Sequence, residues 1–313
     1  MEKIILDVDT GIDDALAIIL AEESGQLDIL GITAVNGNVP VDTVMTNTKK
    51  MIQLMKQDSY TVYRGASRPL VRDAFHEFLV HGRDGLGGAL AGMEVEPGDP
   101  QLFAPDFIIE QVKKYPGEVT LIMVGPLTNL ALAIQKAPEA LKKVKQVVIM
   151  GGLVQKAGFG NTLPTSEFNI FADAEAARIV FHAGLPVKLI SLDVTTQTFL
   201  TREHIEQLKG TYYYDFVLKS TEIYRKYTKE KLGMDGCALH DPLTVGVVLD
   251  PTLVKTAKYY VDVETKGELS YGQTICDFRN LLKKEPNVEI CLDVDAERFV
   301  EMFLKVLGKK EVR

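Results

Sequence analysis

Apolar and polar positions along the chain follow two alternating patterns. Short, nearly continuous apolar runs, typical of buried parallel strands, are separated by stretches in which apolar residues recur at helical spacing. The runs predict strands at residues 3–8, 28–35, 119–124, 144–150, 186–192 and 288–293. The helical spacing predicts helices at residues 13–24, 41–56, 104–115, 127–136, 173–183, 201–208, 211–230, 242–249 and 295–307. This alternation predicts an α/β fold with a mostly parallel central sheet covered by helices on both faces.

The pattern runs through the chain without an internal repeat, a low-complexity tract or a linker rich in Pro, Gly or Ser. We therefore expect residues 1–313 to form a single domain. The Gly-rich stretch 81–98 follows no strand–turn–helix pattern, and it contains neither a dinucleotide-binding fingerprint nor a phosphate loop. We expect residues 76–98 to form a mobile loop over an active site.

Composition and charge narrow the class of protein. Hydrophobic residues make up 46% and charged residues 25% of the chain, and the net charge is −8, so we expect no nucleic-acid partner. The apolar stretches are too short for a membrane span, and the start "MEKIILD" does not have the order of a signal peptide. Cys237, Cys276 and Cys291 form no CxxC pair. We expect them to be reduced thiols of a cytoplasmic protein.

The segment "DVDTGIDDA" places four carboxylates, Asp7, Asp9, Asp13 and Asp14, where the first predicted strand ends. Asp13 and Asp14 are explained if they open a helix, because Asp caps free N–H groups and complements the helix dipole. Asp7 and Asp9 are not explained in this way, since the end of a buried strand is poorly hydrated. Carboxylates this close raise one another's pKa unless a cation holds them together. The cluster therefore predicts a metal site.

The donor atoms of this site indicate the kind of metal. The cluster offers oxygen and neither His nor Cys, which favours calcium or magnesium over zinc. A further carboxylate is available at Asp241, beside His240 in "LHDP". A metal held in this way can activate a water molecule as a nucleophile, and a neighbouring carboxylate can take the proton.

Polar residues after other predicted strands suit a polyhydroxylated substrate. Asn36 and Asn38 lie in "VNGN", Asn161 lies in "FGNT", and Glu167 and Asn169 lie in "SEFN". The spacing of Glu167 and Asn169 places both on one face if that segment is extended. Each Asn alone is equally typical of a turn. Taken together with a metal, the carboxylates and amides indicate a sugar diol as the ligand.

Five motifs, in this order along nearly the whole chain, resemble the nucleoside hydrolases, the inosine–uridine-preferring ribohydrolase family. They are "DVDTGIDDA", "VNGN", "VGPLTNLA", "SEFNIFAD" and "LHDP". The resemblance implies hydrolysis of the N-glycosidic bond of ribonucleosides to free base and ribose, on a parallel-sheet α/β fold with bound Ca²⁺. It also implies a homo-oligomer, either a dimer or a tetramer.

The resemblance further implies roles for residues that match the motifs. Asp9, Asp14, Asp241 and the main-chain carbonyl of Val124 would be calcium ligands, and Asp9 would also be the base that activates the metal-bound water. His240 would protonate the leaving base. The residues implied in substrate binding are Asp13, Asn38, Asn161, Glu167 and Asn169 at the ribose hydroxyls, Leu153 under the ribose, and His81 facing the base.

The base preference is not readable from the sequence. Some purine-specific members of the family stack the base between tryptophans, and this chain has no Trp. Tyr224 and Tyr227, three residues apart on the predicted helix 211–230, could form an aromatic wall for the base. The same face of that helix could instead pack on the core.

Two alternatives stay open. Haloacid-dehalogenase-like phosphatases also carry a DxD motif after the first strand, where the first Asp attacks phosphorus and Mg²⁺ is the cofactor. Their motif normally has Thr or Val where this chain has Gly11, and it does not explain the pair Asp13 and Asp14. The other alternative is a calcium- or nucleoside-binding protein that has lost catalysis. The presence of Asp9 and His240 argues against it.

Overall fold

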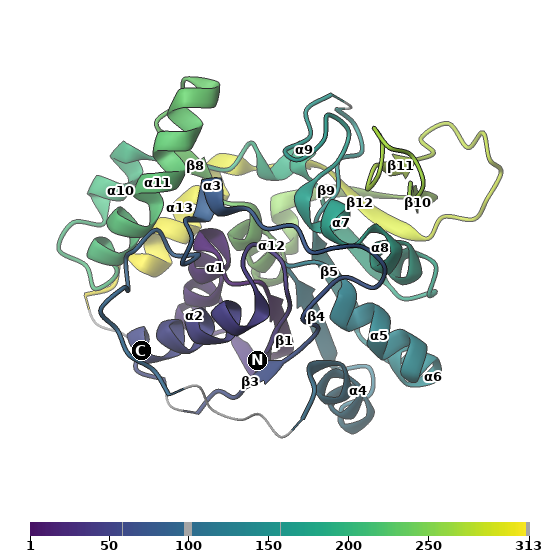
Figure 1. Cartoon of the computed structure of the whole chain (residues 1–313), viewed down its shortest axis with the longest axis horizontal. Helices are drawn as coiled ribbons and strands as arrows, with labels where there is room; N and C mark the ends of the chain where they lie inside the picture. Colours follow the sequence, from purple (N-terminus) through teal and green to yellow (C-terminus); the bar gives the residue numbers. More distant parts are fainter. Residues whose placement is uncertain (58, 97–101, 157, 311–313) are drawn as a thin grey trace.

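An eight-stranded sheet forms the centre of the computed structural model, in the order β3-β2-β1-β4-β5-β6-β12-β9 (Figure 1). The structure describes residues 1–57, 59–96, 102–156 and 158–310. The strands of the sheet are β1 (Glu2–Val8), β2 (Leu27–Ala34), β3 (Val62–Arg64), β4 (Val119–Met123), β5 (Gln146–Met150), β6 (Val187–Ile190), β9 (Val254–Tyr259) and β12 (Val288–Val294). Each neighbouring pair is parallel except β9 and β12, which pair antiparallel.

Helices cover both faces of this sheet. One hydrophobic core packs β1 against α1, α2, α11, α12 and α13, and the other packs it against α4, α5, α6 and α8. Successive side chains of a strand point to opposite faces, so Ile4 and Leu6 enter the first core and Ile5 enters the second. The helices are α1 (Ile12–Ser24), α2 (Val41–Leu54), α3 (Phe78–His81), α4 (Ala104–Lys114), α5 (Thr128–Lys136), α6 (Pro138–Leu141), α7 (Phe168–Ala172), α8 (Ala174–Phe181), α9 (Leu192–Thr195), α10 (Arg202–Gln207), α11 (Tyr214–Leu232), α12 (His240–Leu249) and α13 (Ala296–Leu307).

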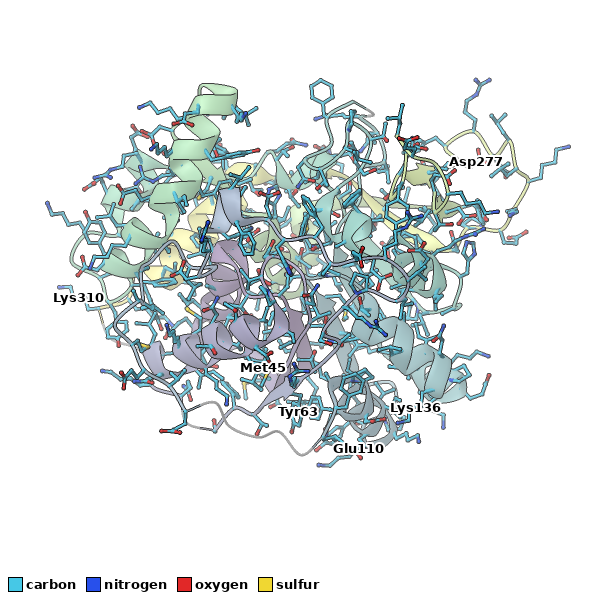
Figure 2. The ribbon with its side chains drawn as sticks, viewed as in Figure 1. Met45, Tyr63, Glu110, Lys136, Asp277 and Lys310 are labelled. Carbon is cyan, nitrogen blue, oxygen red and sulfur yellow. The ribbon has the colours of Figure 1, made fainter. Side chains whose placement is uncertain are left out.

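Short elements complete the described part of the chain. Strands β7 (Phe199–Thr201) and β8 (Gly236–Ala238) pair antiparallel, as do β10 (Val261–Val263) and β11 (Thr274–Cys276). A 3-10 turn, Pro251–Leu253, precedes β9. Charged side chains such as Lys136 and Lys310 point outward at the periphery (Figure 2). Among the described residues, no helix combines the length and apolar character needed to cross a membrane.

The predicted fold class is confirmed, and the six predicted strands correspond to β1, β2, β4, β5, β6 and β12. Each of the nine predicted helices is also present, with its ends shifted by a few residues. The edge strands β3 and β9 were not predicted, because β3 has three residues and β9 is buried only at its first residue, Val254. The predicted strand 186–192 ends earlier, at Ile190, since α9 begins at Leu192.

The condition under which spacing alone would place Glu167 and Asn169 on one face is not met. The chain becomes helical after Glu167, because α7 begins at Phe168 and the Glu167 side chain caps it by accepting hydrogen bonds from the N–H groups of Asn169 and Ile170. Within the predicted loop 76–98, residues 78–81 form α3, whereas residues 97 and 98 lie outside the described residues. The mobility of this loop stays a prediction.

Candidate active site

The carboxylate cluster lies where the sequence pattern placed it, at the carboxyl edge of the parallel sheet. Asp9 follows β1, Asp13 and Asp14 lie in the first turn of α1, and Asp241 lies in the first turn of α12. All four side chains are almost completely buried, with Asp13 the most exposed at 7%. Loops after separate strands therefore bring these acids together, as parallel α/β sheets do for their ligands.

Asp14 is fixed by donors from three directions. Its Oδ1 accepts from the N–H of Asp9 at 3.0 Å, and its Oδ2 accepts from the N–H of Gly11 at 2.9 Å and from Nδ2 of Asn38 at 3.2 Å. Gly11 leaves room for this arrangement, because a Cβ there would lie 2.8 Å from Nδ2 of Asn38 and 2.5 Å from Nδ1 of His81. The first motif thus folds around the Asp14 carboxylate.

Three carboxylate oxygens of the first motif lack any hydrogen-bond partner among the described residues: Oδ1 of Asp7, Oδ1 of Asp9 and Oδ1 of Asp13. The other oxygen of Asp9 accepts from the N–H of Asn38 at 2.7 Å. Burial, followed by the charge of Asp14, raises the pKa of Asp9 well above its ordinary value and that of Asp13 to about 8. Burial and the neighbouring carboxylates also raise the pKa of Asp241. Unpaired buried carboxylates are costly, and a bound cation removes that cost.

The described residues include one group whose donor atoms come close enough to share a metal ion. Oxygens of Asp13, Asp14 and Asp241 all lie within 4.8 Å of one another. The geometry brings Asp14 and Asp241 together with Asp13, which the resemblance implied for the ribose, and this group does not include Asp9. An all-oxygen set of this kind suits a hard divalent cation.

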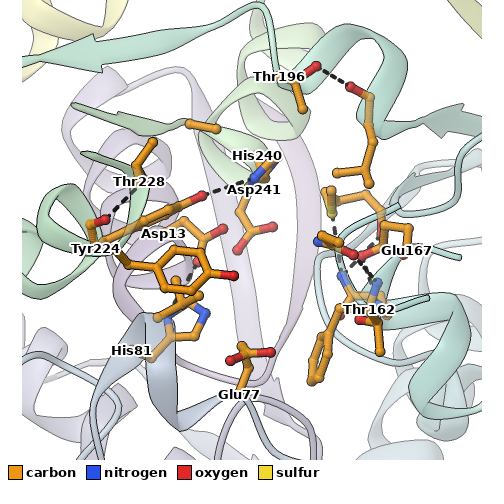
Figure 3. Close-up of a pocket in the computed structure, with 18 of the residues that line it drawn as sticks. Asp13, Glu77, His81, Thr162, Glu167, Thr196, Tyr224, Thr228, His240 and Asp241 are labelled. Carbon is orange, nitrogen blue, oxygen red and sulfur yellow. Dashed lines mark hydrogen bonds and ion pairs between the residues drawn. The ribbon is translucent and has the colours of Figure 1, made fainter. Parts of the chain in front are cut away.

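On the other side of the pocket, Glu167 and Asn169 form a second polar group (Figure 3). Nδ2 of Asn169 donates to the main-chain carbonyl of Val124 at 2.8 Å. Glu167 accepts from the N–H groups of Gly152, Asn169 and Ile170 at 2.9, 2.8 and 3.1 Å. Burial raises the pKa of Glu167.

Asn161 lies on the same side of the pocket, and its Oδ1 accepts from the N–H of Phe168 at 2.9 Å. Leu153 is buried in the hydrophobic core and is not among the residues that line the pocket. The resemblance had implied that Leu153 contacts the ribose.

Two histidines and a tyrosine lie opposite Glu167 (Figure 3). His240 is bonded through both ring nitrogens, Nδ1 with Oγ1 of Thr195 at 2.7 Å and Nε2 with the Tyr224 hydroxyl at 3.1 Å. Burial lowers the pKa of His240 to about 4. Burial, followed by the charge of His240, lowers the pKa of His81 to about 3. Nδ1 of His81 accepts from the N–H of Ile12 at 3.0 Å, which places the proton of the neutral ring on Nε2.

These groups line one cavity of about 350 Å³. Of the residues predicted for the substrate, those that line it are Asp13, Asn38, His81, Asn161, Glu167, Asn169, Tyr224 and Tyr227, and of those predicted for catalysis or the metal, His240, Asp241 and Val124. Asp9 and Asp14 are completely buried and do not line the cavity wall. The structure thus brings the acidic, amide and imidazole groups together around a single space.

Other lining residues were not singled out from the sequence. They include Glu77, Phe159, Thr196, Phe199, Lys231, Leu232 and Met234. Thr196 lies in "SLDVTT", at the end of a predicted strand, so its place in the sequence could have indicated a position at the site. Glu77 lies in the stretch 76–98, which was predicted to form a loop over an active site, whereas Phe159 lies in a loop for which the sequence offers no such signal.

The comparisons with known proteins agree with this geometry. The profile of the family "inosine-uridine preferring nucleoside hydrolase" matches residues 4–301. A pyrimidine-specific ribonucleoside hydrolase RihA from Salmonella arizonae is 38% identical over 308 residues, which cover 97% of each chain.

Solved structures resemble this one over almost its whole length. The purine-preferring ribonucleoside hydrolase from Gardnerella vaginalis is 35% identical with a TM-score of 0.88, and the match covers 98% of each chain. The plant nucleoside hydrolase PpNRh1 is 32% identical with a TM-score of 0.90, over 98% of this chain and 99% of that one. This family match accounts for the motif "DVDTGIDDA", so the phosphatase alternative is not needed to explain it. The chain belongs to the inosine-uridine preferring nucleoside hydrolase family.

Proposed function

We propose that this nucleoside hydrolase cleaves the N-glycosidic bond of ribonucleosides in a calcium-dependent reaction, with Asp9 as the general base and His240 as the general acid. Family membership supports hydrolysis of ribonucleosides by this chain. The observation that supports the finer proposal most directly is the pair of buried, unpartnered carboxylate oxygens on Asp9 and Asp13.

The donor set fits a calcium ion. We assign Asp9, Asp14, Asp241 and the main-chain carbonyl of Val124 as its ligands. The cluster offers oxygen alone, and its buried carboxylates have raised pKa values because burial and mutual repulsion disfavour their charge. When bound, a divalent cation lowers the pKa of a water molecule and orients it for attack.

Asp9 suits the role of base because its two oxygens have different tasks. Oδ2 accepts from the N–H of Asn38, which fixes the orientation of the carboxylate. Oδ1 accepts no hydrogen bond from the described residues, so it is available to take a proton from the attacking water. Deprotonated water then attacks the anomeric carbon of the ribose, and the bond to the base nitrogen breaks.

Polar residues on both sides of the pocket suit the sugar. We assign Asp13, Asn38, Asn161, Glu167 and Asn169 to the ribose hydroxyls. Cleavage of a glycosidic bond gives the sugar ring positive character, so an anionic pocket stabilises the transition state more than the ground state. Leu153 is left out of this assignment because it is buried away from the cavity.

The aromatic wall suits the base. We assign His81, Tyr224 and Tyr227 to contacts with the base, and His240 to protonation of its leaving nitrogen. His240 is held between Thr195 and Tyr224, so its ring orientation is fixed before the substrate enters. Proton transfer by a positioned side chain typically contributes about 10²–10⁴-fold to the rate.

An assay of ribose release tests this proposal. Inosine, adenosine, uridine and cytidine are each incubated with the protein, with and without a calcium chelator, beside a phosphate-ester control. Both base classes are needed, since one relative is named pyrimidine-specific and one structural neighbour purine-preferring. We expect ribose release that is lost with the chelator and restored by calcium. Calcium binding without turnover on any nucleoside would identify a binding protein instead.

A further inference from the structure

One buried carboxylate beside the pocket has no role in the proposed chemistry. Asp193 lies in α9, is 2% exposed, and accepts four hydrogen bonds. Its Oδ2 accepts from the N–H of Val154 and the hydroxyl of Ser191, both at 2.8 Å. Its Oδ1 accepts from the N–H groups of Gln155 at 3.1 Å and Lys156 at 2.9 Å. Three successive main-chain donors of the loop after β5 therefore converge on one side chain.

The loop held in this way leads directly to the pocket. Residues 159–162, further along it, line the cavity, and Asn161 is the member of this group that we assign to the ribose. Asn161 is bonded to the N–H of Phe168 in α7 at 2.9 Å. The loop is thus anchored to α9 near its start and to α7 near its end.

The same short helix also reaches the opposite side of the site. Thr195 is bonded to His240, and Thr196 lines the cavity. Asp193 therefore connects the helix that holds His240 to the loop that carries Asn161. A carboxylate suits this position because its two oxygens can accept all four hydrogen bonds, whereas an amide has one oxygen.

We propose that Asp193 is a positioning residue for substrate binding: its carboxylate fixes the turn at residues 154–156 and thereby holds Asn161 at the ribose end of the pocket. This inference rests on the proposed function, since that function assigns Asn161 to the ribose. Asp193 touches neither substrate nor metal in this scheme and acts through the loop.

The test compares Asp193→Asn, Asn161→Ala and the double variant with the unchanged protein. Asn at position 193 retains one acceptor oxygen, and its NH₂ group cannot accept from a main-chain N–H, so at least one of the three main-chain hydrogen bonds is lost. We expect the KM for the best nucleoside to rise about tenfold while kcat changes less, the size of effect that one or two hydrogen bonds produce. If Asp193 acts through Asn161, the double variant has about the same KM as Asn161→Ala.

Asp250→Asn is the matched control. Asp250 also accepts a main-chain N–H, from Thr252 at 3.0 Å, together with the Thr252 hydroxyl and Arg298, and it does not line the pocket. We expect the Asp250→Asn substitution to lower Tm without raising KM. A KM for Asp193→Asn as low as that of this control, or effects of Asp193→Asn and Asn161→Ala that multiply in the double variant, would overturn the proposal.

A second measurement does not depend on activity. Lys156 is exposed and its N–H is one of the groups held by Asp193, so trypsin should cut after Lys156 faster in Asp193→Asn than in the unchanged protein or in Asp250→Asn. If the unchanged protein releases no ribose, the proposed function is wrong. If trypsin cuts after Lys156 at the same rate in Asp193→Asn and in the unchanged protein, Asp193 does not anchor the loop. The two failures are therefore distinguishable.

Discussion

The side-chain amide of Asn169 donates a hydrogen bond to the main-chain carbonyl of Val124 over 2.8 Å. Asn169 belongs to the group assigned to the ribose, and the Val124 carbonyl is assigned to the metal. The two assigned subsites are therefore in direct contact, through Asn169 of α7 and Val124, the residue that follows β4. A side chain that contacts both subsites should influence both kinds of binding.

This contact predicts that Asn169→Ala weakens calcium binding as well as substrate binding. Removal of the amide leaves the Val124 carbonyl without its donor and free to turn, so its alignment toward the metal is lost. We expect a loss of about tenfold in each affinity, in line with one hydrogen bond. Isothermal titration with calcium and the KM of the best nucleoside measure the two effects.

Asn161→Ala is the control for this prediction, because Asn161 bonds to the N–H of Phe168 and not to Val124. It should raise KM and leave calcium affinity unchanged. Equal calcium affinities in the unchanged protein and in Asn169→Ala would show that the Val124 carbonyl does not depend on Asn169.

Asp9→Asn should abolish turnover while the protein stays folded. The change removes the base and a metal ligand at once, and we expect kcat to fall by about 10²–10⁴-fold or more. In the calcium-free protein, the same change replaces a carboxyl group whose charge is disfavoured by burial and by Asp14 with a neutral amide. Its Tm without calcium should therefore equal or exceed that of the unchanged protein.

Ribose release, circular dichroism and thermal melts with and without calcium measure these effects of Asp9→Asn. Near-normal turnover by this variant would refute the assignment of Asp9. A Tm far below that of the unchanged protein in the absence of calcium would show that the Asp9 carboxylate stabilises the fold.

His240→Ala should slow natural nucleosides much more than a riboside whose leaving group needs no proton. A natural base departs poorly as an anion, so loss of the acid costs about 10²–10⁴-fold, whereas p-nitrophenyl riboside should lose less than about tenfold. The kcat/KM values of both substrates give the comparison. Equal losses would mean that His240 has a structural role between Thr195 and Tyr224.

The sequence predicts the centre of this fold well, for a physical reason. Strands buried on both faces are apolar at almost every position, as in β4, where all five residues are buried. The edge strand β9 reads "VKTAKY" and is intermediate or exposed at every residue after Val254, so its sequence has no continuous apolar run. Short helices such as α7 were not predicted, because local capping decides where they begin, here through the Glu167 side chain.

The candidate site follows the same logic. The positions of Asp9, Asp14 and Asp241 could be predicted because each lies in a motif at a strand or helix end. Several carboxylates buried together at such places are costly unless a cation binds them. Asp193 was not, because its role depends on which loop packs against α9, and that is decided by the fold. Leu153 was placed in the pocket by resemblance alone, and the structure buries it in the core.

Gly37→Ala should damage the site through Asp9. A Cβ at Gly37 would lie 2.0 Å from Oδ2 of Asp9, the oxygen that the N–H of Asn38 holds. Overpacking of this kind costs about 1–3 kcal/mol of stability, and it displaces the carboxylate assigned to both metal and base. We expect a lower Tm, weaker calcium binding and a large loss of kcat.

Gly92→Ala is the matched control for this change, because a Cβ at Gly92 meets no atom within 4 Å. It should leave the melting temperature, calcium affinity and kcat unchanged. If Gly37→Ala has these effects and Gly92→Ala does not, the Asp9 carboxylate requires a glycine at position 37. If Gly37→Ala instead melts and turns over like Gly92→Ala, the space beside Asp9 can open at little cost, and a tightly fixed base is not needed for the reaction.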